Sequence, residues 1–220
     1  MRNITLVCTE HEENGRCNVS GLYEILERVQ PEVIFLEIPR SFSDQYFEEK
    51  SRRNLETTAV NRYRESHKTE LVPVDIYEVS DDFFEKNRRL HQKIGSSSSE
   101  YRRLVDRNSQ YVKECGYAYL NSEHCTKLWS DIYKCMDEAI DRIDEDELFK
   151  TYELWKQVME HRDHEMMENI FKYSKAHEFR SAAFLVGAAH RQSIIEKTKS
   201  PSELESVRPK WNYSDYEGLF

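Results

Sequence analysis

Four short runs of apolar residues lie along the chain, and each has the length of a buried β-strand. They are Ile4–Cys8, Val33–Leu36, Leu71–Ile76 and Ala182–Val186. Between the first two runs, apolar residues recur at i, i+3, i+4 and i+7 from Leu22 to Val29, which predicts an amphipathic helix. Asn18 or Ser20 can cap this helix and Pro31 ends it. Pro73 weakens the third run, because proline cannot donate to a sheet ladder.

The middle of the chain, from about residue 80 to 180, has a helical pattern throughout. A helix is expected over 81–94, ended by Gly95 and the serines at 96–99. Two longer stripes of apolar residues at helical spacing follow, over 128–143 and 148–170. A short helix and a polar tail come after the strand at 182–186. This order predicts an α/β fold with a central, mainly parallel sheet flanked by helices. We expect one domain over 1–220, with a long all-helical insertion over 80–180 before the last strand.

The composition excludes several classes of protein. Acidic residues outnumber basic ones by 41 to 32, a net charge of −9, so no nucleic-acid partner is expected. No apolar run approaches the ~18 residues of a membrane span, and polar residues follow the first strand at once, so neither a membrane partner nor a signal peptide is expected. The five cysteines form no CxxC pair, which is typical of reduced thiols in a cytoplasmic protein.

Titratable residues follow the predicted strands. His11 and His190 each lie just past the carboxyl end of an apolar run, within the similar segments Leu-Val-Cys-Thr-Glu-His and Leu-Val-Gly-Ala-Ala-His. Glu37 follows the second strand and Asp75 lies at the end of the third. Ligands bind at the carboxyl edge of an open α/β sheet, so these four groups converge on one site if the strands are parallel neighbours. For Asp75 alone, the start of a loop is the simpler interpretation.

Arg162 is a second, independent indication of a site. It lies three residues after Met159 and four before Met166, within the apolar stripe of its helix. A guanidinium that points towards a core needs an anionic partner, and Glu37 is a candidate. A buried Arg–Glu pair that fixes helix to sheet is the structural alternative. His161 and His164, on the same helix, are interpreted as part of a solvated face rather than as metal ligands.

These residues, taken in order, resemble the TraB/Tiki superfamily, which also includes erythromycin esterases and a haem-binding lipoprotein. Its pattern is a G-x-x-H near the N-terminus, a glutamate after the second strand, an arginine in a helix and a second G-x-x-H near the C-terminus. The corresponding segments here are Cys8–His11, with cysteine in place of the glycine, Glu37 in Leu-Glu-Ile-Pro, Arg162 in His-Arg-Asp-His-Glu, and Gly187–His190. The resemblance implies an α/β fold with a cleft at the strand ends and, in some members, metal-dependent hydrolysis of peptide or ester bonds.

The first functional hypothesis is therefore a hydrolase that acts on a small-molecule or peptide substrate. His11, Glu37 and His190 would either hold a divalent metal ion such as Mn, Co or Zn, or activate a water by general-base action. Arg162 would hold an anionic part of the substrate or stabilise an oxyanion, and Asp75 and Gly187 would line the substrate site.

Two alternatives stay open at this point. One is a non-catalytic module on the same fold that binds a small ligand, a metal or haem. The other is a structural scaffold in which the Arg–Glu pair and the histidines form a satisfied polar core. The apolar and aromatic face of the helix over 148–171 would serve a homo-oligomer as well as a core.

Overall fold

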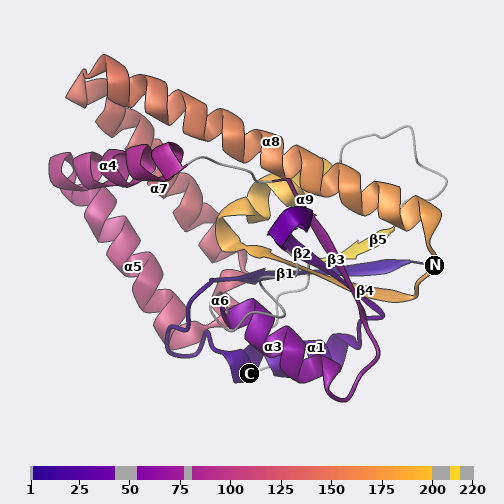
Figure 1. The fold of residues 1–220 in the computed structure, drawn as a ribbon. Coiled ribbons are helices and arrows are strands. Elements are labelled where there is room, and N and C mark those ends of the chain that lie inside the picture. Colours follow the sequence, from indigo (N-terminus) through magenta and orange to yellow (C-terminus); the bar gives the residue numbers. More distant parts are fainter. Residues whose placement is uncertain (1, 43–53, 77–80, 200–208, 214–220) are drawn as a thin grey trace.

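The computed structural model describes residues 2–42, 54–76, 81–199 and 209–213. Its centre is a five-stranded sheet in the order β3-β2-β4-β1-β5, in which every strand pair is parallel (Figure 1). The strands are β1 (Asn3–Thr9), β2 (Val33–Pro39), β3 (Glu70–Asp75), β4 (Ser181–Gly187) and β5 (Lys210–Asn212). Within the described ranges, no helix has both the length and the apolar composition needed to cross a bilayer.

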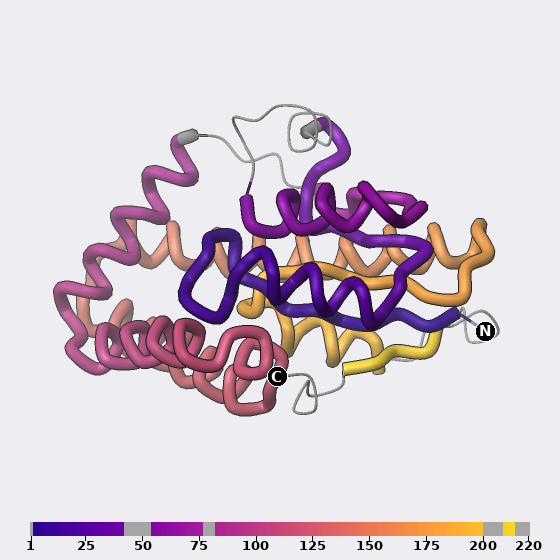
Figure 2. Tube along the Cα trace, turned by 90° about the horizontal axis from the view of Figure 1, so that it is seen from below, coloured from indigo at the N-terminus to yellow at the C-terminus, as the bar shows by residue number. Residues whose placement is uncertain are grey.

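The helices cover both faces of the sheet. Helices α1 (Val19–Val29) and α3 (Leu55–Arg64) lie on one face, and the long helix α8 (Asp146–Ala176) crosses the other, as Figures 1 and 2 show from two directions. Helix α9 (Arg191–Lys199) packs beside α8. Right-handed crossovers account for this division: β1 to β2 and β2 to β3 move one way along the sheet, whereas β3 to β4 and β4 to β5 move the other way.

The remaining helices form a block that extends beyond the carboxyl ends of β1 and β4 (Figure 1). They are α4 (Asp81–Ser97), α5 (Ser99–Cys115), α6 (Tyr117–Leu120) and α7 (Glu123–Ile143). Together with α8 they occupy the chain between β3 and β4, as the sequence pattern predicts. Two single-turn 3-10 helices, η1 (Arg40–Phe42) and η3 (Ala188–His190), follow β2 and β4.

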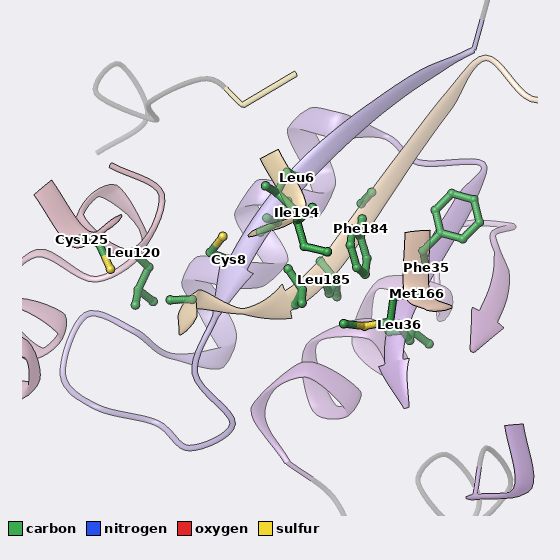
Figure 3. Packing of buried hydrophobic residues seen from close by; sticks show 14 of the residues in the cluster. Leu6, Cys8, Phe35, Leu36, Leu120, Cys125, Met166, Phe184, Leu185 and Ile194 are labelled. Carbon is green, nitrogen blue, oxygen red and sulfur yellow. The ribbon is translucent and has the colours of Figure 1, made fainter. Parts of the chain in front are cut away.

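The core lies on both faces of the sheet and is continuous with the helical block. Leu6, Phe184 and Phe35 are cross-strand neighbours on β1, β4 and β2, and Ile194 of α9 packs beside Leu6 (Figure 3). All four side chains are fully buried. Each large apolar side chain of this kind contributes roughly 1.5–3 kcal/mol when it is removed from water. This packing therefore fixes the positions of β1, β2 and β4 relative to one another.

A side chain replaces a missing strand where β1 meets the helical block. The short β5 pairs with β1 only from Asn3 to Thr5, so among the described residues no strand pairs with Cys8 on that edge of β1. The fully buried Asn121, between α6 and α7, fills that place: its Oδ1 accepts from the Cys8 N–H at 2.7 Å and its Nδ2 donates to the Cys8 carbonyl at 3.1 Å. Buried backbone groups need such partners, and this pair of bonds anchors the block to the sheet.

Two sequence-based predictions about secondary structure need correction. The helix expected to end before Gly95 continues to Ser97, because the buried Leu90 and Ile94 outweigh the roughly 1 kcal/mol cost of glycine, and Ser98 then caps α5. The polar tail contains a fifth strand, β5, so the strand at 181–187 is not the last. The polar segment over 43–68 has a helical composition, and α3 lies within it; residues 43–53 lie outside the described residues. Pro73 is tolerated because β3 is an edge strand.

Candidate functional site

A cavity of about 740 Å³ opens at the carboxyl ends of β1, β2, β3 and β4. The chain leaves β1 and β2 towards the face of α1 and α3, but leaves β4, which lies between them, towards the opposite face. Ligands bind in such a crevice in open α/β sheets, and the volume is typical of a small-molecule site. Six residues singled out from the sequence line it: His11, Glu37, Asp75, Arg162, Gly187 and His190.

Arg162 is clamped between two carboxylates at one side of the cavity. Its Nη2 lies 2.7 Å from Glu37 Oε1 and 2.8 Å from Asp75 Oδ2, and its Nε is 3.3 Å from both Asp75 oxygens. Burial lowers the pKa of a guanidinium, but the two carboxylates more than compensate and raise the pKa of Arg162 above its ordinary value. The sequence-based pairing of Arg162 with Glu37 is therefore present, and Asp75 is a second partner.

The His190 imidazole lies between two carboxylates and is almost completely buried. Its Nδ1 bonds to Asp163 of α8, and its Nε2 lies 3.2 Å from Glu37 Oε1. Burial lowers the pKa of an imidazole, yet the charge of Glu37 and the bond to Asp163 outweigh it and raise the pKa of His190 to about 10. His190 is therefore an imidazolium at neutral pH, donating from both ring nitrogens.

These contacts join into one chain of alternating charges, Asp163–His190–Glu37–Arg162–Asp75, which we call the charge chain. Its central carboxylate, Glu37, also accepts the Gly187 N–H through Oε2 at 2.6 Å. Burial raises the pKa of a carboxyl, but His190 and Arg162 hold the pKa of Glu37 well below its usual range. With three carboxylates and two cations, the charge chain has a formal net charge of −1.

His11 forms a separate pair with Glu56, which lies on α3. The Nδ1 of His11 is 3.2 Å from Glu56 Oε1, and the hydroxyl of Thr9 donates to the same oxygen at 2.6 Å. The Glu56 side chain is 9% exposed whereas that of His11 is 61% exposed at the rim of the cavity. The bond to Glu56 outweighs burial and raises the pKa of His11 to about 9. Among the described residues no hydrogen-bond partner is found for His11 Nε2 or for Glu56 Oε2.

The structure adds two carboxylates that the sequence reasoning missed. Asp163 precedes Met166, Met167 and Ile170 by three, four and seven residues, so its place on the buried stripe of α8 was a readable signal. Glu56 carries no such signal, because it lies in a polar segment in the first turn of α3. The exposed positions of His161 and His164 agree with a solvated face.

The predicted metal ligands are only partly grouped. The 3.2 Å between His190 Nε2 and Glu37 Oε1 is close to the ~3.3 Å that separates two ligands on one tetrahedral ion, and Asp163 orients the other ring nitrogen as carboxylates do in zinc sites. Arg162, however, donates to that same oxygen, and His11 is bonded to Glu56 instead. In the parts of the chain that the structure describes, no three His, Cys, Asp or Glu side chains are grouped to hold an ion, so the residues as placed do not complete a metal centre.

Most of the site's polar atoms are therefore bonded within the site. Both nitrogens of His190, both oxygens of Glu37 and of Asp75, and the Gly187 N–H are engaged in these contacts. Asp75 and Gly187 therefore support the charge chain, and their contact with a substrate stays a prediction. His11 Nε2, at the rim of the cavity, has no hydrogen-bond partner among the described residues. No family model, curated protein or solved structure matches this chain, so the function has to be inferred from these residues.

Proposed function

We propose that the protein hydrolyses an ester or peptide bond and that His11 is its general acid–base residue. The observation that carries the proposal is the His11–Glu56 pair at the rim of the cavity, next to the charge chain. A carboxylate that accepts from Nδ1 fixes the imidazole tautomer and leaves Nε2 to take a proton from water. The class of reaction agrees with the resemblance to the TraB/Tiki superfamily, which is part of the proposal.

In this proposal the charge chain supports hydrolysis in two ways. Glu37 favours the charged form of His11, so it stabilises the imidazolium that forms when Nε2 removes a proton from water. Arg162, whose side chain is 14% exposed, lies in the wall of the cavity, where a substrate carbonyl can approach its guanidinium. Carboxylates on both sides hold that guanidinium in place, so it is preorganised to polarise the carbonyl oxygen.

The test is hydrolysis of a panel of p-nitrophenyl esters and fluorogenic peptides. In His11→Gln, kcat/KM should fall by at least about 100-fold, the lower limit for loss of a general base. His161→Gln is the matched control, because His161 is an exposed histidine on α8 that does not line the cavity. Equal rates for His11→Gln and the parent protein would refute the role of His11. If no member of the panel is cleaved, the non-catalytic binding module is the better description.

Metal dependence is a separate arm of the same assay. Two of the predicted ligands, Glu37 and His190, lie at a separation that one ion could bridge. If activity survives dialysis against a chelator, the acid–base proposal stands without metal. If chelation abolishes activity and Mn²⁺, Co²⁺ or Zn²⁺ restores it, with His190→Ala losing the ion, metal-assisted hydrolysis replaces it.

A further inference from the structure

A second cavity, whose lining includes no member of the charge chain, contains a buried cation that has no counter-ion among the described residues. It has a volume of about 550 Å³ and lies between α7 and α9, next to Tyr213. Arg191, the first residue of α9, lines it and is only 3% exposed. This residue directly follows His190 in the chain, but the proposed hydrolysis does not use it.

Within the described parts of the chain, the side chain of Arg191 forms hydrogen bonds to neutral groups alone. Nη1 lies 4.0 Å from the Cys8 Sγ, and Nη2 donates to the Tyr213 carbonyl at 3.4 Å. Nε is buried without a hydrogen-bond partner among the described residues. Burial raises the pKa of the Cys8 thiol to about 11, so this thiol stays neutral at pH 7 and does not balance the guanidinium. An uncompensated buried charge is strongly destabilising, so a buried guanidinium in these surroundings calls for an anionic partner.

Two further cations lie at the same cavity. Lys127 of α7 and Lys199 of α9 both line it, and neither forms an ion pair within the described part of the chain. With Glu123 and Glu196 also in the wall, the lining carries three cations and two carboxylates. The cavity is thus locally positive in a chain whose net charge is −9. An anionic ligand would balance this excess of positive charge and would accept a hydrogen bond from the unbonded Nε of Arg191.

We propose that Arg191, with Lys127 and Lys199, forms a binding site for an oxyanion group, either a phosphate or a carboxylate. The planar guanidinium binds both groups through paired N–H donors, and the two lysines add charge at the mouth of the cavity. The site is independent of the proposed hydrolysis, because none of its three cations belongs to the charge chain or to the His11–Glu56 pair.

Thermal unfolding in the presence of inorganic phosphate tests the site. Phosphate at a hundred-fold excess over its Kd should raise the Tm by roughly 5–10 °C, whereas KCl at the same ionic strength should not. Acetate and citrate form the second arm: a response to phosphate alone identifies a phosphorylated ligand, and a response to all three identifies a general oxyanion site. Calorimetric titration measures the same binding directly. If none of the three anions raises the Tm, the proposal is overturned.

Substitutions of the three cations locate the response. Arg191→Met should be at least as stable as the parent protein in anion-free buffer, because it removes an unbalanced buried charge, and it should lose the Tm response. Arg88→Met, an exposed arginine on α4, is the control and should keep the response. If Arg191→Met fails to fold, the exposed pair Lys127→Met and Lys199→Met still decides the case: the phosphate Kd should rise at least tenfold, and an unchanged Kd would contradict the proposed site.

Discussion

Replacing Glu37 with glutamine removes one negative charge from the centre of the charge chain and leaves the side-chain size unchanged. In the parent protein, Oε1 accepts from Arg162 and lies beside His190 Nε2, and Oε2 accepts from the Gly187 N–H. Glutamine offers one oxygen and one NH₂ group. If the glutamine oxygen accepts from the Gly187 N–H, its NH₂ group faces the Arg162 donor. If the oxygen instead accepts from Arg162, the NH₂ group faces the Gly187 N–H. Either orientation leaves a buried donor opposite another donor.

The expected loss of stability follows from these contacts. Breaking a buried ion pair costs about 3–5 kcal/mol, but Arg162 retains Asp75 and His190 retains Asp163. We therefore expect Glu37→Gln to lower the free energy of unfolding by about 3 kcal/mol. For a chain of 220 residues, this corresponds to a Tm lower by roughly 6–12 °C. Urea unfolding followed by far-ultraviolet circular dichroism measures the loss.

Glu32→Gln is a closely matched control at the other end of the same strands. Glu32 also accepts a backbone N–H and a guanidinium, both from Arg180, at 2.8 Å each. The Arg180 side chain is 90% exposed, however, so this pair should contribute at most about 1 kcal/mol. Equal losses in the two variants, or a loss below about 1 kcal/mol for Glu37→Gln, would refute the claim that the charge chain holds the strand ends together.

Three further predictions concern the anchor of the helical block and the two histidines. Asn121→Ala leaves the buried N–H and carbonyl of Cys8 without partners and should cost about 3 kcal/mol in urea unfolding; a loss below 1 kcal/mol would contradict the anchoring role. Because the folded pKa of His190 is raised to about 10 from an unfolded value near 6.5, its stabilisation is complete below pH 6.5 and is lost as pH rises through 10. The midpoint concentration of guanidinium chloride in unfolding experiments should therefore fall between pH 6.5 and 10 in the parent protein. In His190→Gln this midpoint should change less over the same pH range. Because the proposed hydrolysis needs neutral His11, the activity should rise with pH up to about 9. Glu56→Gln should shift this rise in the pH–rate profile towards pH 6.5. If the rise does not shift, it reports the titration of another group.

The sequence by itself determined the positions of four strands and the residues at their ends. Continuous apolar runs mark strands that are covered on both faces, and polar residues such as His11 and Glu37 mark where those strands reach the edge of the sheet. The place of Arg162 within an apolar helical stripe likewise predicted an anionic partner. All of these signals are local, since they depend on residues within one helix or strand, and the structure agrees with each of them.

Tertiary structure alone decided which groups meet, and with that the chemistry of the site. Glu56 and Asp163 are each far in sequence from the histidine they contact, and nothing in the local pattern of α3 indicates that Glu56 would pair with His11. The sequence pattern does not indicate the three-residue β5 for the same reason, because β1, the strand with which it pairs, is distant in the sequence. Hydrogen bonds and charge pairs depend on distance in space, which the strand order and the helix crossings set. Those follow from packing of the whole chain, not from the pattern of any one segment.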